Sequence, residues 1–302
     1  MEDDYKILKE TGKISVEALE YSKTIIKEGV SILDAAEKIE NFILNKGYQL
    51  SFPINLSINE KAAHYTPFID SVYKFQKNDL VKVDLGARKG NNLSDCAITI
   101  DLSGENQKMI ETAEKALEEA ISLVKSGRKV REIGAAIENV AVKNGLKPIF
   151  NLGGHGIESE ELHAGNFIPN YDNGDETELQ EGDIISIEPF ITNGIGHVSD
   201  GDDVQIFQLL EYDVPTPRSQ DTREILKLIQ EKYLTYPFSL RWIAKELKNI
   251  SEFKLKRAVS ELDQLGVLEK FPVLIEKKNG LVAQAEKELI VEKDSCTILT
   301  KM

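Results

Sequence analysis

Two aspartates lie in a stretch of the sequence that is typical of a β-hairpin. Apolar and polar residues alternate over residues 81–85, as in a half-buried strand, and residues 90–92 (Gly-Asn-Asn) favour a turn. Asp84 lies on the first predicted strand, and Asp95 lies on the second, over residues 94–100. Two carboxylates on paired strands repel each other and are costly to desolvate, and a cation between them removes both penalties. The stretch alone leaves open that both are solvated strand residues.

The elements that must position these acids repeat along the chain. Apolar residues recur at helical spacing in four segments. The predicted helices span residues 14–29, 30–48, 110–127 and 128–146. A shift of 98 positions places the first pair on the second with nine identical residues between positions 18 and 47. The glycines at the helix ends also align, Gly47 with Gly145.

The repeat continues into the strands. Residues 78–84 resemble residues 182–188 after a shift of 104, and the polar loop at residues 169–176 accommodates the six extra residues. Asp84 and Glu188 therefore occupy equivalent strand positions. We expect two halves that pack across a pseudo-twofold axis, with these two acids facing each other.

Three of the four histidines lie in the duplicated segments. His155 is surrounded by glycines that let the backbone approach a ligand, His163 follows eight residues later, and His64 lies in the matching part of the first half. Histidines in register with acidic strand positions favour a functional site. His197 has no partner in the pattern, and we expect it to be structural.

Composition limits the class of protein. The 302 residues are 41% hydrophobic and 29% charged, which is typical of a globular chain, and the net charge is -14. An acidic chain of this kind is not expected to bind nucleic acid or a membrane surface. The two cysteines, the polar N-terminus and the lack of a long apolar run predict a cytoplasmic protein in a reducing compartment. We expect a monomer with a single catalytic domain over residues 1–302.

Residues 219–272 predict a small helical insertion. Its helices are expected at residues 223–232, 240–248 and 254–265. Residues 221–270 carry ten Lys or Arg against eight Asp or Glu, which is far less basic than a nucleic-acid footprint. A solvated insertion is the simpler interpretation, and a contact with the ribosome stays open.

The segment at residues 280–291 predicts a strand that returns to the core. It carries Glu286 and Glu288, which share one face of the strand, so spacing cannot choose between them.

The candidate ligands together form one constellation. They are Asp84, Asp95, His155, Glu188 and Glu286. Four carboxylates and one imidazole without a thiolate suit two divalent ions such as Co, Mn, Fe(II) or Zn. Two such ions typically activate a shared water for hydrolysis.

The same motifs carry a family resemblance that covers nearly the whole chain in order. The motifs are Phe-Pro-Ile-Asn at residues 52–55, Ala-Ala-His-Tyr-Thr-Pro at 62–67, Val-Asp-Leu-Gly at 83–86, Asn-Leu-Gly-Gly-His-Gly at 151–156, Leu-His-Ala-Gly at 162–165, Ile-Glu-Pro-Phe at 187–190 and Ala-Gln-Ala-Glu at 283–286. This set resembles type II methionine aminopeptidases, and the helical insertion and short N-terminus resemble the archaeal form. The resemblance implies a pita-bread α/β (α+β) fold, with a central antiparallel sheet covered by helices and a winged-helix-like insertion.

The resemblance also implies roles for the residues. All five constellation residues are implied to bind metal, Asp95 and Glu286 to bridge both ions, and Glu188 to accept and donate the proton during the reaction. It favours Glu286 over Glu288 as the ligand. The expected reaction is hydrolytic removal of the initiator methionine from nascent or newly made polypeptides, with a preference for small second residues.

His64 and His163 are implied to bind the substrate peptide and to stabilise the tetrahedral intermediate. Phe52, Pro53 and Asn55 match the segment near the methionine pocket, although strand packing explains them equally well. The sequence departs from the family at residues 287–288, where Lys-Glu replaces the usual His-Thr.

Two alternatives remain. A proline dipeptidase on the same fold usually carries a further domain before the catalytic one, whereas the first duplicated helix here is expected near residue 14. A non-catalytic peptide- or ribosome-binding relative would lack ligands, and all five are present in this sequence.

Overall fold

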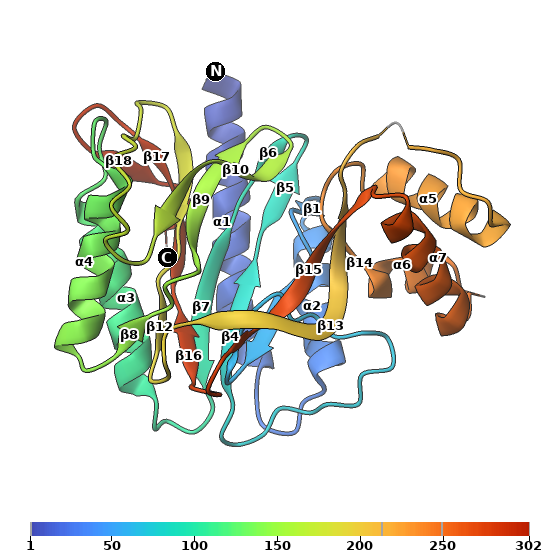
Figure 1. Cartoon of the computed structure of the whole chain (residues 1–302), viewed down its shortest axis with the longest axis horizontal. Helices are drawn as coiled ribbons and strands as arrows, with labels where there is room; N and C mark the ends of the chain where they lie inside the picture. Colours follow the sequence, from blue (N-terminus) through green and yellow to red (C-terminus); the bar gives the residue numbers. More distant parts are fainter. Residues whose placement is uncertain (1, 213, 249, 302) are drawn as a thin grey trace.

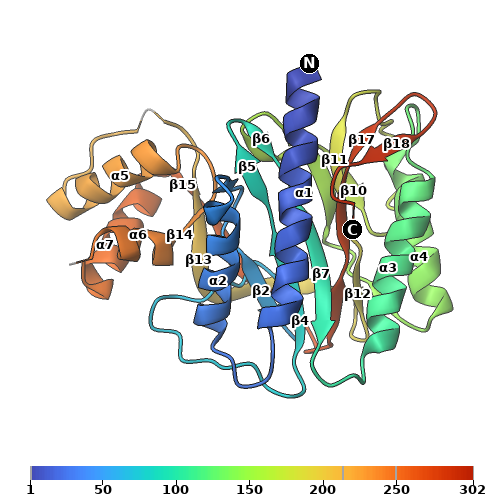
Figure 2. The same cartoon turned by 180° about the vertical axis from the view of Figure 1, so that it is seen from behind.

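The computed structural model describes residues 2–212, 214–248 and 250–301. Four helices, α1 to α4, cover one face of a curved antiparallel sheet, and three further helices form a separate lobe (Figures 1 and 2). The helices are α1 (Glu2–Ile25), α2 (Ile32–Asn45), α3 (Gln107–Ser122), α4 (Val130–Lys143), α5 (Gln220–Lys232), α6 (Leu240–Glu246) and α7 (Glu252–Gln264). No helix in the described ranges is both long enough and apolar enough to cross a membrane.

The central sheet has eight strands, and the two halves of the chain meet in its middle. Its main path runs β10 (Glu161–Pro169), β9 (Gly153–Glu158), β11 (Ile184–Ile187), β17 (Glu286–Val291), β7 (Cys96–Asp101), β4 (Leu80–Leu85) and β2 (Asn55–Ile58), and β18 (Cys296–Ile298) pairs with β17. The halves join where Glu286 of β17 lies opposite Ala97 of β7. The order β2-β4-β7 on one side therefore mirrors β9-β11-β17 on the other.

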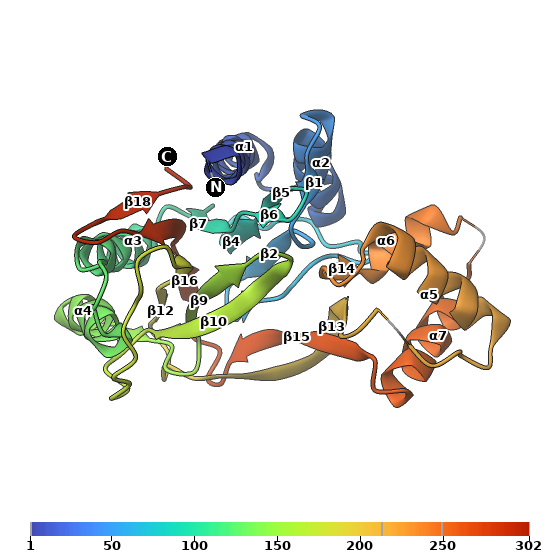
Figure 3. The ribbon, with the colours of Figure 1, turned by 90° about the horizontal axis from the view of Figure 1, so that it is seen from above.

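Three smaller sheets complete the fold. The first contains β1 (Gln49–Leu50), β5 (Ala87–Lys89) and β6 (Asn92–Leu93); the second contains β16 (Val282–Gln284), β12 (Phe190–Thr192) and β8 (Lys147–Pro148); the third contains β14 (Phe238–Ser239), β13 (Val198–Leu209), β15 (Leu268–Glu276) and β3 (Lys61–Ala63). The long β13–β15 ribbon lies across from α1 and α2, on the far side of the central sheet (Figure 3).

Equivalent hydrogen bonds confirm the predicted duplication. The backbone N–H of Gly29 donates to the carbonyl of Phe75, and that of Gly127 donates to the carbonyl of Leu179, each over 2.8 Å. These pairs are related by the shifts of 98 and 104 found in the sequence. Both glycines have a positive φ, 81° and 77°, a backbone conformation that residues with a Cβ atom rarely adopt.

Each half builds its core from the apolar faces of its own two helices. In α2 the buried residues are Ile32, Ala35, Ala36, Ile39, Glu40 and Ile43, which recur at helical spacing. The Ser31 side chain caps this helix by accepting a hydrogen bond from the N–H of Asp34. The helices α1 and α2 pack on β2, β4 and β7, whereas α3 and α4 pack on β11 and β17.

The prediction that the first helix begins near residue 14 is wrong, because α1 begins at Glu2. Leu8 and Thr11 are buried within this extra length. A Cβ on Gly12 would lie 2.5 Å from the carbonyl oxygen of Leu299, so the helix passes directly against the C-terminal segment. Packing with a segment that is distant in the sequence extends the helix where the local pattern did not require it.

The helical insertion forms at the predicted place, within a few residues of the predicted bounds. The helices α5, α6 and α7 lie between β13 and β15 in the chain and share a separate apolar core. A buried ion pair ties this lobe to the first half: Arg241 of α6 donates to both carboxylate oxygens of Glu40 at 2.7 and 2.8 Å. Glu40 also accepts from the backbone N–H of Ile54, so the contact reaches the segment that enters β2.

Candidate metal centre

The five candidate ligands come from strand ends on both sides of the pseudo-twofold axis. Asp84 lies in β4, His155 in β9, and Glu286 at the start of β17, whereas Asp95 and Glu188 lie next to the ends of β7 and β11. All five line one cavity of about 550 Å3. The structure therefore brings together every residue of the predicted constellation.

The position of Asp95 corrects one detail of the predicted hairpin. The second strand was expected over residues 94–100, but β7 begins at Cys96, and Asp95 lies in a break between β6 and β7. A Cβ on Gly86 would lie only 1.9 Å from the carbonyl oxygen of Ser94, so the opposing strand needs glycine there. The break frees Asp95 from regular strand geometry, and its side chain reaches the cavity.

The distances between the ligands fit a metal centre. The Nε2 atom of His155 lies 3.4 Å from Asp95 Oδ2 and 4.0 Å from Glu188 Oε1. Ligand atoms of Asp95, His155 and Glu286 all lie within 4.8 Å of one another. The Oδ1 atoms of Asp84 and Asp95 are buried and accept no hydrogen bond from the described residues. Such buried acceptors are costly unless a cation satisfies them, so the donor set fits divalent metal.

Hydrogen bonds orient two of the ligands. The Nδ1 atom of His155 lies 3.1 Å from the carbonyl oxygen of Gly156, which can only accept, so Nδ1 carries a proton and Nε2 is the ring nitrogen that faces Asp95. The Ser186 hydroxyl donates to Glu286 Oε1 over 2.5 Å.

Burial and mutual repulsion act together on the acids. Burial raises the pKa of Asp84 well above its usual value, and the Asp95 charge raises it further. Burial also raises the pKa of Glu188, with Asp84 and Asp95 adding to the effect. Burial raises the pKa of Glu286 as well, and repulsion from the charges of Asp95, Glu188 and Asp84 raises it further. A divalent ion would reverse this balance because it binds the ionised form.

This balance predicts how stability depends on pH. In the presence of a chelator, the unfolded acids ionise above pH about 4 while the folded acids resist ionisation. The free energy of unfolding contributed by these groups is therefore present at low pH and is lost as pH rises toward their raised pKa values. Added Mn²⁺ should then stabilise the protein more at pH 7 than at pH 5, as measured by urea unfolding with chelator and with metal. Equal stabilisation at the two pH values would contradict this expectation.

Two further histidines face the same cavity. His64 follows β3 with a φ of 64°, and His163 lies in β10. Burial lowers the pKa of His64 to about 4, and burial together with the charges of His155 and His64 lowers the pKa of His163 well below its usual value. Both rings are therefore neutral near pH 7. The His163 ring packs against that of His155, with centroids 4.5 Å apart.

The predicted methionine-pocket segment is only partly at the cavity. Phe52 and Asn55 line it, whereas the carbonyl of Pro53 accepts a hydrogen bond from the Asn55 side-chain amide. His197 does not line this cavity and packs against the Phe150 ring at 5.4 Å. This packing agrees with the expectation that His197 has a structural role.

Glu288 lies beside the centre without lining the cavity. Its side chain is fully buried, and its Oε2 accepts a hydrogen bond from the backbone N–H of Asp95 over 3.3 Å. Glu286 lines the cavity and Glu288 does not. The tertiary structure therefore distinguishes two acids that the alternation of strand residues placed on the same face.

Sequence reasoning missed two residues of this site. Phe271 of β15 packs on both His64 and His163, with centroids 5.5 and 5.9 Å away. Gln284 of β16 directs its amide at three of the carboxylates. Phe271 lies near the end of the predicted insertion, and nothing in its local pattern marks it, whereas Gln284 belongs to a motif that already contained Glu286.

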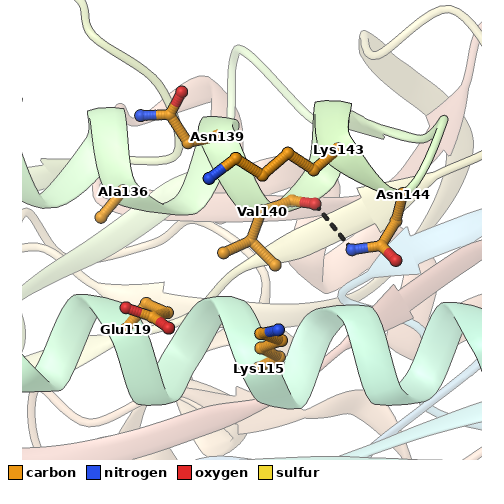
Figure 4. A pocket seen from close by; sticks show the side chains of 7 residues that line it. All are labelled: Lys115, Glu119, Ala136, Asn139, Val140, Lys143 and Asn144. Atoms are coloured by element: carbon orange, nitrogen blue, oxygen red, sulfur yellow. Dashed lines mark hydrogen bonds between the residues drawn. The ribbon is translucent and has the colours of Figure 1, made fainter.

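A second hollow lies on the outer surface between α3 and α4 (Figure 4). It has a volume of about 300 Å3 and is lined by Lys115, Glu119, Ala136, Asn139, Val140, Lys143 and Asn144. One acid among two lysines provides neither a set of metal ligands nor an activated nucleophile. The cavity with the five candidate ligands is therefore the candidate active site.

Known proteins resemble this chain in sequence and in fold. The model of metallopeptidase family M24 matches residues 6–210. A methionine aminopeptidase of Pyrococcus horikoshii is 42% identical over 299 residues, covering 99% of this chain and 100% of that protein. A solved thermophilic Arx1 superposes with a TM-score of 0.85 at 18% identity, covering 98% of this chain and 90% of that one. A solved methionine aminopeptidase from Thermotoga maritima gives a TM-score of 0.69 at 19% identity, covering 97% and 95%.

The cavity lined by four carboxylates and one imidazole, together with the family match, places the chain among metallopeptidases. The chain belongs to metallopeptidase family M24. The predicted family and the predicted pita-bread fold are thereby confirmed.

Proposed function

We propose that this protein is a metal-dependent aminopeptidase that hydrolytically removes the N-terminal methionine from polypeptides. The convergence of Asp84, Asp95, His155, Glu188 and Glu286 in one cavity is the observation that carries the proposal. The prediction of an aminopeptidase is confirmed by relatives of that activity, which match the chain almost from end to end. Use of divalent metal agrees with the family and with the buried acceptors of the site.

The proposed centre holds two ions, drawn from Co, Mn, Fe(II) or Zn. Asp95 and Glu286, which both line the cavity, would help to hold both ions, as the family resemblance implies. Asp84, His155 and Glu188 would complete the coordination. Bound ions would polarise the scissile carbonyl and activate a water.

The residues around the ions would position the substrate and move the proton. Glu188 is the proposed proton carrier, because its carboxyl group lines the cavity and its Oε1 atom lies 4.0 Å from His155 Nε2. The Nδ1 atom of His64 lies 3.2 Å from the Pro272 carbonyl and so carries its proton. Its Nε2 would then accept a hydrogen bond from a substrate N–H. Neutral His163 would donate to the developing oxyanion.

The cavity walls would receive the methionine side chain and limit the next residue. Phe52, Leu162 and Phe271 supply apolar surface there, and Asn55 supplies a polar group. A preference for small second residues stays a prediction, as does a contact of the insertion with the ribosome. The N-termini of nascent or newly made chains are the proposed substrates.

Peptide hydrolysis tests this proposal directly. With added Mn or Co, we expect methionine to be released from peptides that begin Met-Gly and Met-Pro. Asp95→Ala should lower kcat/KM by at least about a thousandfold, the scale of losing several kcal/mol of charge stabilisation. The control Asp294→Ala changes an exposed acid and should leave the rate unchanged.

Other outcomes would favour other functions. Hydrolysis of Ala-Pro dipeptides without release of methionine from longer peptides would favour a proline dipeptidase. Peptide binding without hydrolysis, with any of the four ions, would favour a non-catalytic protein. Methionine release unaffected by Asp95→Ala would count against the proposed centre.

A further inference from the structure

Gln284 contacts three of the five candidate ligands although its amide carries no charge. Its Nε2 atom lies 3.4 Å from Asp84 Oδ2, 3.2 Å from Glu188 Oε2 and 3.4 Å from Glu286 Oε2. Asp84 belongs to the first half of the duplication, and Glu188 belongs to the second. A single amide group therefore joins acids from both sides of the pseudo-twofold axis.

The hydrogen-bonding chemistry assigns the orientation of this amide. Carboxylate oxygens that are ionised only accept hydrogen bonds, so the amide NH2 group, rather than its oxygen, must face them. The Oε1 atom of Gln284 accordingly finds no partner among the described residues. An NH2 group has two protons, so it serves three acceptors only by sharing, which agrees with the long distances.

The backbone of Gln284 is held independently of its side chain. The Thr99 hydroxyl donates to the carbonyl of Gln284 over 2.7 Å and lies 2.8 Å from its backbone N–H, which donates in return. Gln284 also pairs with Phe190 in the register of β16 and β12. Only 1% of the residue is exposed. The amide is therefore delivered to the carboxylates by a fixed backbone in a packed environment.

We propose that Gln284 is a positioning residue of the metal centre, whose amide holds the carboxylates of Asp84, Glu188 and Glu286 in the arrangement that binds divalent ions. This inference rests on the proposed function only in requiring that these acids bind metal. Groups that orient metal ligands typically contribute a factor of about 10 to 100 in metal affinity.

Metal binding to the purified full chain tests the role of Gln284. Gln284→Met keeps the length of the side chain and removes the amide. Calorimetric titration of metal-depleted protein with Mn²⁺ should give a Kd about 10 to 100 times that of the parent. The matched control Gln205→Met removes an amide from β13 that contacts Asp203 instead, and its Kd should equal that of the parent.

A milder variant keeps the test valid if Gln284→Met folds poorly by circular dichroism. Gln284→Asn retains an amide but shortens the side chain by one carbon, about 1.5 Å, so its contacts with the acids should be lost and metal affinity should again fall. At saturating Mn²⁺, we expect a lower kcat with little change in KM, because the substrate contacts remain.

Two results would overturn this role. A Kd within twofold of the parent value for the folded variants would show that Gln284 only fills space. Failure of the parent protein to bind Mn²⁺ would overturn both the metal centre and the role of Gln284. Mn²⁺ binding that is equally tight in the parent and the variants would overturn the role of Gln284 alone.

Discussion

Glu188→Gln should lower kcat by roughly 10²- to 10⁴-fold, the range that general acid–base catalysis contributes. The substitution keeps the size of the side chain but removes its ability to take and return a proton. The parent carboxyl group can take and return a proton at the cavity that it lines beside His155. Steady-state hydrolysis of a peptide that begins Met-Gly measures the change.

The control for this experiment is Glu181→Gln, which changes an exposed acid seven residues earlier in the chain. Because Glu188 is also a candidate ligand, metal content must be measured in the same samples. A variant that retains its metal and its full kcat would exclude Glu188 as the proton carrier.

Arg241→Ala should remove about 3–5 kcal/mol from the free energy of unfolding, because it leaves the Glu40 carboxylate buried without its partner. Arg241 is fully buried, and Glu40 is 4% exposed. Among the described residues, the indole N–H of Trp242 and the backbone N–H of Ile54 are the donors to Glu40 that would remain. Urea unfolding followed by circular dichroism measures the loss.

Two comparisons make this result specific. Lys254→Ala breaks the exposed pair with Asp221 and should cost less than about 1 kcal/mol. The double variant Arg241→Met with Glu40→Met removes both charges and should recover much of the lost stability. If Arg241→Ala were no more destabilising than Lys254→Ala, the buried pair would not anchor the insertion.

The same ion pair connects stability to the active site. Glu40 accepts from the backbone N–H of Ile54, and Ile54 lies between Phe52 and Asn55, which line the cavity. The insertion also supplies the β15 segment that carries Phe271. The strand β15 therefore lines one side of the cavity, and the helical lobe beside it is held to the first half of the chain by the Glu40 carboxylate.

The duplication explains why the site lies where it does. The central strands β7 and β17 are equivalent in the two halves, and each begins next to a candidate bridging acid. The strands β4 and β11 flank them and supply Asp84 and Glu188. Neither half contains the full set of ligands, so packing of the two halves creates the centre.

The amino-acid sequence alone determined the family, the duplicated architecture and the five candidate ligands, because these depend on residue types at fixed spacings. The aligned repeats predicted that Asp84 and Glu188 are equivalent. Gly29 and Gly127, which have a positive φ in both halves, occupy equivalent positions after the first helix of each half. Motif spacing carries this information since it reflects local backbone geometry and strand position.

Only the tertiary structure decided which groups surround those ligands. The break that directs Asp95 into the cavity depends on the close approach of Gly86 to Ser94. The packing of Phe271 against the two histidines and the contacts of the Gln284 amide join residues from separate strands. Such contacts depend on how twisted strands from both halves and the insertion meet in space, and no local sequence pattern records that arrangement.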